Sequence, residues 1–238
     1  MRVLPILFNT DMTRAILDGR KTVTRRVVKF SENRNPQWSG YIPDGAVLYG
    51  SNNVPAAKSP YRPGDVLWVR ETFRVDYLSN IVGSGRVHYK ADGSFGDLHF
   101  QPARYDMMRR AQLKPGWRPS ENMPREAARI WLRVTSVRVE RLQEMTEDDV
   151  VAEGAEPLIR CHNEHPVWDE NGVMYGMCWN EDCCGSHCDY IEKSYGELFG
   201  ELVWDSTIKQ AGSDKYGWAA NPWVWVSAFE RCEKPEVA

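Results

Sequence analysis

The eight residues GRKTVTRR, at positions 19–26, decide how this 238-residue sequence is interpreted. Four cations surround two hydroxyl groups in this stretch, and its first glycine directly follows a short helical pattern. We expect that helix over 11–18, with Asn9 or Thr10 as its N-cap and the glycine as its stop. A β-rich strand over 22–30 should follow, because threonine and valine dominate there. The stretch therefore predicts a helix that turns directly into a strand.

A lysine crowded by cations is the first candidate for chemistry. Like charges disfavour the protonated form, so the three arginines of the stretch should lower the pKa of Lys21. A neutral lysine beside a threonine hydroxyl is one route to an activated nucleophile. On a flat strand Lys21 and Thr24 point to opposite faces, so they meet only where the chain turns or twists. The alternative is an exposed basic strand edge that deters aggregation, and composition alone favours it.

Strand patterns recur along the chain between long polar segments. We expect further strands over 2–8, 65–73, 87–89, 130–139 and 222–231. The expected helices cover 147–153, between Thr146 and Gly154, and 190–209. Segments 31–60 and 93–124 are expected to be loops, the first with a short hairpin over 41–49. Many strands and few helices predict an α+β fold, mainly β: a small mixed β-barrel with a few short helices and long loop insertions.

Length and composition indicate one domain over 1–238, with insertions at about 31–60, 91–124 and 155–188. Apolar residues make up 42% and charged residues 26%, which excludes disorder of the whole chain. No apolar run approaches the ~18 residues that a membrane span needs. The apolar start over 3–8 is too short for a signal peptide. We therefore expect a cytoplasmic protein without a membrane partner.

The net charge of −3 hides a strong polarity along the chain. Residues 1–30 carry a local balance of +5 and residues 101–142 one of +6, whereas residues 144–205 carry −14. The basic blocks form either a surface for phosphate-bearing partners or ordinary solvated faces, and the pattern leaves both open. The acidic segment argues against a protein that coats nucleic acid on all sides.

All six cysteines follow residue 160, and three of the five histidines lie among them. Thiolate and imidazole groups at this density are typical of zinc sites, although the spacing is irregular. One arrangement of a structural zinc uses four thiolates, those of Cys161, Cys178, Cys184 and Cys188. The alternative is a loop of reduced thiols that binds nothing.

The motif Gly19-Arg20-Lys21-Thr22-x-Thr24 after a short helix resembles the signature of the ASCH family, small PUA-like barrels thought to bind RNA or nucleosides. Tyr61–Leu67 is similar to the family's Pro/x-Gly-Asp strand entry, and Leu142–Gly154 to its helix that ends in an acidic residue. Three segments resemble longer members carried by bacteriophages and prophages: 117–120, 123–125 and 221–226. The resemblance implies the PUA-like barrel as the fold.

One branch of this family hydrolyses the exocyclic amide of N4-acetylcytidine to cytidine and acetate. Its working lysine and threonine match Lys21 and Thr24, and its glutamate falls at Glu153 when the helices are aligned at their threonines. The resemblance thus implies an amidohydrolase that needs no cofactor for catalysis. Lys21 would be the base, Thr24 the nucleophile, and Glu153 the proton donor or substrate holder. Alternatively, Lys21 activates a water that Thr24 positions.

Four further residues are predicted to bind the substrate: Arg20, Arg26, Glu71 and Arg125. Arg26, or backbone N–H groups near the turn at residue 19, would stabilise the oxyanion. Glu71 is either a second carboxylate at the barrel mouth or an ordinary partner of Arg70 or Arg74.

The rival hypothesis is a non-catalytic module that binds single-stranded RNA or a modified nucleotide through an unpaired base. Its phosphate contacts would come from five arginines: Arg20, Arg25, Arg26, Arg125 and Arg129. A third hypothesis is a phage accessory protein that binds a host protein through its acidic half.

Overall fold

The computed structural model describes residues 1–30, 40–42, 47–49, 55–79, 83–113, 116–155 and 195–236. Its contacts divide the chain into two units. The first unit comprises residues 1–19, 61–136 and 228–238, and the second comprises residues 20–60 and 137–227.

The strands are β1 (Val3–Leu7), β2 (Val23–Val27), β3 (Gly40–Ile42), β4 (Val47–Tyr49), β5 (Pro55–Lys58), β6 (Val66–Arg70), β7 (Phe73–Ser79), β8 (Ser84–Tyr89), β9 (Phe95–His99), β10 (Trp131–Arg141) and β11 (Trp223–Cys232). The α-helices are α1 (Thr10–Leu17), α2 (Pro102–Gln112), α3 (Glu147–Ala152), α5 (Tyr195–Leu198), α6 (Asp205–Thr207) and α7 (Ser213–Tyr216). A π-helical segment, η4 (Phe199–Trp204), joins α5 to α6. The short 3₁₀ turns are η1 (Ser120–Asn122), η2 (Arg125–Ala127), η3 (Leu142–Glu144), η5 (Gln210–Gly212) and η6 (Trp218–Ala220). None of the helices in these described segments is long and apolar enough to cross a membrane.

The largest sheet has five strands in the order β1-β6-β10-β11-β2. β1 runs parallel to β6, with Ile6 opposite Val69, and β10 runs antiparallel to β6, with Trp131 opposite Trp68. Two further sheets have three strands each, β3-β4-β5 and β7-β8-β9. The expected α+β class, mainly strand with few short helices, is confirmed. Within the described chain the five-stranded sheet is open, with β1 and β2 as its edges, rather than closed into a barrel.

The expected helix after the first strand is α1 of the first unit. Asn9 is its N-cap, and the side chain of Asn9 accepts a hydrogen bond from the N–H of Met12 at 2.8 Å. Ala15 and Ile16 are buried on the inner face of the helix. Gly19 follows the helix at φ +78°, a left-handed conformation that glycine adopts without steric cost. The sequence thus predicted both ends of this helix.

We expect Asn9→Ala to lower the free energy of unfolding by about 1 kcal/mol, because the Met12 N–H loses its acceptor. Asn9→Asp is the matched control, since aspartate is an equally good N-cap and should retain the stability. Urea denaturation of the three proteins checks this. An alanine variant as stable as the aspartate variant would contradict the role of the cap.

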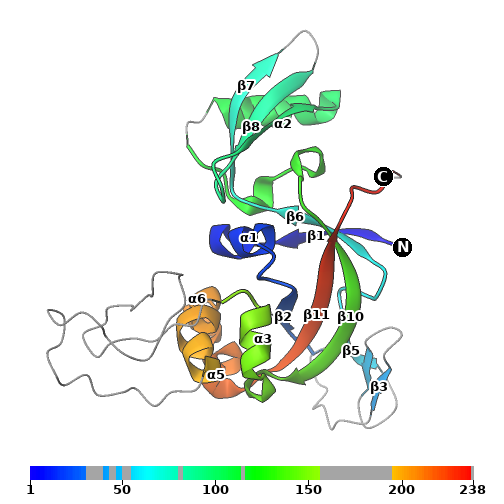
Figure 1. The fold of residues 1–238 in the computed structure, drawn as a ribbon, viewed down its shortest axis with the longest axis vertical. Helices are drawn as coiled ribbons and strands as arrows, with labels where there is room; N and C mark the ends of the chain where they lie inside the picture. Colours follow the sequence, from blue (N-terminus) through cyan, green and yellow to red (C-terminus); the bar gives the residue numbers. More distant parts are fainter. Residues whose placement is uncertain are drawn as a thin grey trace, which may run out of the picture. The chain divides into compact units, whose positions relative to one another are not determined.

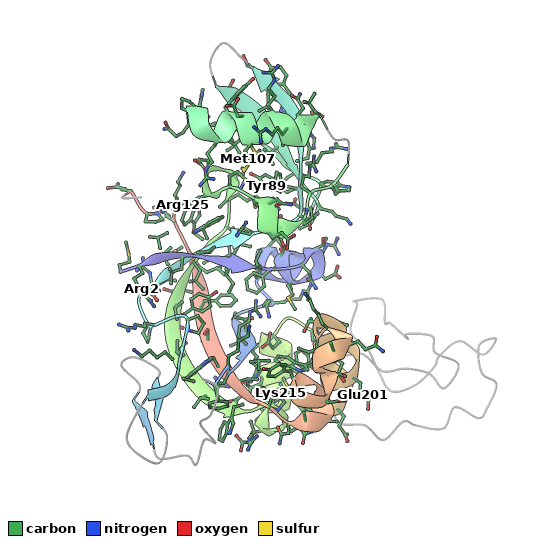
Figure 2. All side chains as sticks on the ribbon, turned by 180° about the vertical axis from the view of Figure 1, so that it is seen from behind. Arg2, Tyr89, Met107, Arg125, Glu201 and Lys215 are labelled. Atoms are coloured by element: carbon green, nitrogen blue, oxygen red, sulfur yellow. The ribbon has the colours of Figure 1, made fainter. Side chains whose placement is uncertain are left out.

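A helix and a strand occupy part of the segment that the sequence analysis predicted as a loop. β9 and α2 lie within 93–124, so the loop prediction is wrong for 95–99 and 102–112. α2 lies across β7 and β8 (Figure 1). Met108 is fully buried in a cluster with Phe73 and Val87, and Met107 packs against that cluster (Figure 2). The helix forms because good helix formers follow Pro102, although few of its positions are apolar.

The second unit contains the predicted hairpin and the predicted helix after Thr146. β3 pairs with β4 in antiparallel register, as expected for 41–49. α3 begins at its N-cap Thr146, whose side chain accepts from the Asp149 N–H, and α5 contacts α3 (Figure 1). Of the helix expected over 190–209, the part from Tyr195 to Thr207 is helical, and residues 190–194 lie outside the described residues. β10 loses its alternation after Val134, because Thr135 and Ser136 are both exposed before Val137 is buried again.

Candidate functional site

The end of α3 and the start of β2 bring two candidate residues together in the second unit. Lys21 and Glu153 lie opposite each other in an isolated antiparallel β-bridge. Beside them the N–H of Thr22 donates to the carbonyl of Ala152 at 2.8 Å. Glu153 is the C-cap of α3, and Gly154 follows it at φ +75°, which ends the helix. The pair is therefore fixed by backbone contacts as well as by side chains.

Lys21 forms a buried ion pair with Glu153. The side chain of Lys21 is fully buried and that of Glu153 is 5% exposed. Lys21 Nζ donates to Glu153 Oε2 at 2.5 Å, to the Glu153 carbonyl at 2.8 Å and to the Val23 carbonyl at 2.8 Å. These three acceptors match the three N–H donors of an ammonium group. The arrangement is thus that of a charged lysine held by a carboxylate.

The pKa of Lys21 is lowered, as the sequence predicted. Burial is the largest cause, and the charges of Arg26 and Arg25 lower it further, while Glu153 acts in the opposite direction. The predicted direction is therefore confirmed, with burial rather than crowding by arginines as the main cause. A lysine with a lowered pKa loses its proton at a lower pH than an exposed lysine, which is what a general base requires.

Arg25 lies at the centre of a network of carboxylates around this pair. Its guanidinium donates to Glu140 Oε1 from Nε at 3.0 Å and from Nη2 at 2.7 Å. Nη1 donates to Glu153 Oε1 at 3.2 Å, and Nη2 lies 3.0 Å from Asp149 Oδ1. The side chain is fully buried, so the alternative of an exposed basic strand edge is wrong for Lys21 and Arg25, although β2 is an edge strand.

The same network holds the pKa of Asp149 at about 2. Burial alone would raise this pKa, but the Thr146 N–H and the guanidinium groups of Arg25 and Arg138 outweigh it. A carboxyl group whose pKa is lowered on folding stabilises the protein above its unfolded pKa, and this contribution is lost as the pH falls through the folded pKa. The stabilisation from Asp149 is therefore present at neutral pH and disappears between about pH 4 and pH 2.

We expect Asp149→Asn to be less stable than the wild type at pH 7 and to approach it as the pH falls toward 2, because the wild-type carboxyl group becomes protonated there. Asp148→Asn is the matched control, since Asp148 is an exposed neighbour in the same helical turn. Denaturant unfolding at several pH values checks this. A stability difference that stays constant across the range would rule out the electrostatic role.

Thr24 and Arg26 form a second contact beside the pair. Thr24 is 1% exposed, and its hydroxyl accepts from Arg26 Nη1 at 2.9 Å. Alternation along β2 turns Thr24 away from the face that carries Arg25. The Lys21 ammonium donates to the carbonyl of Val23, the residue before Thr24. Arg20 donates to the Gly154 carbonyl at 3.0 Å, so it stabilises the turn after Glu153.

The two remaining predicted site residues belong to the first unit. Both oxygens of Glu71 accept from Arg129, at 2.8 Å each, so its partner is neither of the arginines that the sequence suggested. Burial raises the pKa of Glu71 even against this guanidinium. Arg125 lies over the ring of Trp131 at 5.4 Å. The structure thus describes Glu71 and Arg125 in contacts of their own unit.

The zinc prediction lies outside the described residues. All four predicted ligands, Cys161, Cys178, Cys184 and Cys188, fall in the segment 156–194. Elsewhere in the described chain no group of three or more His, Cys, Asp or Glu side chains is arranged to hold a metal ion. The structural zinc stays a prediction.

The sequence analysis missed the residues that surround Arg25. Glu140, Asp149 and Arg138 come from β10 and α3, more than a hundred positions after Arg25. One local signal was present, since Thr146 and Asp149 have the spacing of a capping box that ties a carboxylate to the helix start. Nothing in the sequence connected that carboxylate to Arg25.

No family model matches the chain, and no curated protein and no solved structure matches it either.

Proposed function

We propose that this chain is an amidohydrolase that removes the acyl group from N4-acetylcytidine or a related N-acylated cytosine nucleoside. The observation that carries the proposal is the buried pair of Lys21 and Glu153. Hydrolysis of a linear amide needs a base for the attacking oxygen and an acid for the leaving amine. A lysine with a lowered pKa in contact with a carboxyl group supplies both functions. The resemblance of the motif to the ASCH family favours this substrate class.

In the proposed reaction the neutral amine of Lys21 takes the hydroxyl proton of Thr24 as the threonine oxygen attacks the acyl carbon. The new C–O bond converts the acyl carbonyl into an oxyanion. Lys21 is then an ammonium group, and it passes a proton to Glu153 through the contact between them. Glu153 gives this proton to the N4 amine as the C–N bond breaks and cytidine leaves. Water attacks the acyl-threonine in the same way and releases the carboxylic acid.

Arg26 supplies a donor for the oxyanion in this scheme. Its guanidinium already donates to the Thr24 hydroxyl at 2.9 Å. An oxyanion on the carbon bonded to that oxygen would therefore form within reach of the same positive group. Removing one oxyanion donor in enzymes typically costs ~2.7–4 kcal/mol of transition-state stabilisation.

The charge arrangement favours this function over a phosphate-binding module. Two of the arginines assigned to phosphate contacts, Arg25 and Arg129, are engaged with carboxylates. A phosphate would have to displace these buried or half-buried ion pairs, which costs more than contacting an exposed cation. A nucleoside substrate has no phosphate, so it can bind without displacing these ion pairs.

The test is release of cytidine from N4-acetylcytidine by the purified 238-residue protein, measured by chromatography. Thr24→Ala and Thr24→Ser distinguish the two routes for the attacking oxygen. If threonine is the nucleophile, the serine variant retains turnover, the alanine variant loses it, and an acetylated Thr24 accumulates under single-turnover conditions. Turnover by the alanine variant would assign the attack to a water. Absence of cytidine release by the wild type at stoichiometric enzyme would refute the proposed function.

A further inference from the structure

We propose that Arg25 is the positioning residue of the Lys21–Glu153 pair: it holds one oxygen of Glu153 so that the other stays on Lys21. Arg25 Nη1 donates to Oε1 at 3.2 Å, while Oε2 accepts from Lys21 Nζ at 2.5 Å. The carboxyl group thus has a separate cationic partner for each oxygen. Rotation of the carboxyl group would break one of the two contacts.

Arg25 can fix this orientation because its own orientation is fixed. Its remaining nitrogens are held by Glu140, at 3.0 and 2.7 Å, and by Asp149, at 3.0 Å. The guanidinium is planar and its N–H donors form a rigid fork. Contacts that fix two edges of this plane therefore also fix the direction of the third edge, which faces Glu153. Lysine has no such fork and could hold Glu153 only as a point charge.

The charge of Arg25 also acts on Lys21. A permanent positive charge nearby disfavours a proton on Lys21 and lowers its pKa. This effect favours the neutral amine that serves as the base. The carboxylates of Glu140 and Asp149 offset the charge of Arg25, and Arg138 pairs with both of them. The network has equal numbers of cations (Lys21, Arg25, Arg138) and anions (Glu140, Asp149, Glu153).

The adjoining segments carry further charged groups: Arg20 before Lys21, Glu147 and Asp148 on α3, and Arg141 on β10. Arg26, next on β2, also lowers the pKa of Lys21. Glu197 and Glu201 belong to the segment that begins with α5, the helix in contact with α3, and both are exposed. Trp223–Ser227, the part of β11 in this unit, carries no titratable side chain. Among the described residues, Arg25 donates directly to Glu153 and its charge also lowers the pKa of Lys21.

Because this role of Arg25 rests on the proposed hydrolysis, its first test uses no substrate. The side-chain signal of Lys21, identified by its loss in Lys21→Arg, is titrated by NMR in the wild type, Arg25→Met and Arg138→Met. Arg138 is the matched control, since it donates to Glu140 and Asp149 at 2.9 and 2.7 Å. We expect the pKa of Lys21 to rise in Arg25→Met and to stay unchanged in Arg138→Met. Arg25→Gln is a second neutral variant that keeps a side-chain N–H donor.

A Lys21 titration that is the same in the wild type and in a folded neutral variant at position 25 would overturn the role of Arg25.

Kinetics supply the second test. Arg25→Met should move the acidic limb of the pH profile of kcat/KM to higher pH, because the pKa of Lys21 rises. Arg25→Lys should restore that limb and still lose about 10²-fold in kcat/KM, since it keeps the charge and loses the orientation. Full kcat/KM in Arg25→Lys would also overturn positioning by the guanidinium. If the wild type shows no turnover, only the proposed function is refuted. The NMR comparison then decides the role of Arg25.

Discussion

Replacing Lys21 by methionine is expected to lower kcat/KM for N4-acetylcytidine by about 10²–10⁴-fold, the usual contribution of a general base. Methionine fills a similar volume but accepts no proton, and Glu153 retains its contact with Arg25. The wild-type rate should rise with pH through the lowered pKa of Lys21, because the neutral amine is the active form. The Lys21→Met variant should lack this rise.

Lys29→Met is the control for this substitution, because Lys29 is exposed two residues after the end of β2. It should keep the rate and the pH profile of the wild type. Circular dichroism and urea unfolding establish that Lys21→Met is folded under the assay conditions. A folded Lys21→Met protein with wild-type kcat/KM would exclude Lys21 as the base and with it the proposed mechanism.

Local signals predicted the ends of two helices, α1 and the helix α3 that carries Glu153. The cap at Asn9 and the stop at Gly19 bounded α1, and Thr146 and Gly154 bounded α3. Each of these signals acts within a few residues, so a single sequence contains it in full. The alternation of apolar and polar residues also predicted where β10 lies, including the loss of alternation before Val137.

The helix α2 was missed because its burial does not follow a clear apolar stripe. Arginines occupy positions 104, 109 and 110, and among the described side chains of the helix only Met108 is fully buried. Its core contacts come from β7 and β8, which sequence alone did not pair. Local helix propensity was the available signal, and the polar character of the segment concealed it.

The site itself was predicted in part. The resemblance aligned Glu153 with Lys21 across 132 positions, and the structure brings these two residues into contact. The sequence left three roles open for Arg25: a charge that lowers the Lys21 pKa, part of an exposed basic edge, or a phosphate contact. In the structure it is buried against three carboxylates from distant segments. Such a network depends on tertiary contacts that neither spacing nor composition encodes. The burial of Arg25 could therefore be found only in the structure.

Glu153→Leu is expected to cost about 3–5 kcal/mol of unfolding free energy, the usual effect of removing one partner of a buried ion pair. The substitution leaves the ammonium of Lys21 buried beside Arg25 without the carboxylate between them. Lys21 then loses its proton more readily in the folded state than in the unfolded state. The unfolded state binds more protons above that folded pKa, so the stability of the variant should recover as the pH rises.

The double variant Lys21→Met with Glu153→Leu separates this charge effect from the loss of packing. It removes one cation and one anion, and Arg25 keeps Glu140 and Asp149 as partners. We therefore expect the double variant to be more stable than Glu153→Leu alone, because apolar replacement of a whole buried pair is often nearly neutral. Urea unfolding of the four proteins gives the coupling free energy of the pair. Additive losses of stability would mean that Lys21 and Glu153 do not stabilise each other. The contact at 2.5 Å would then contribute neither to the stability nor to the proton transfer proposed above.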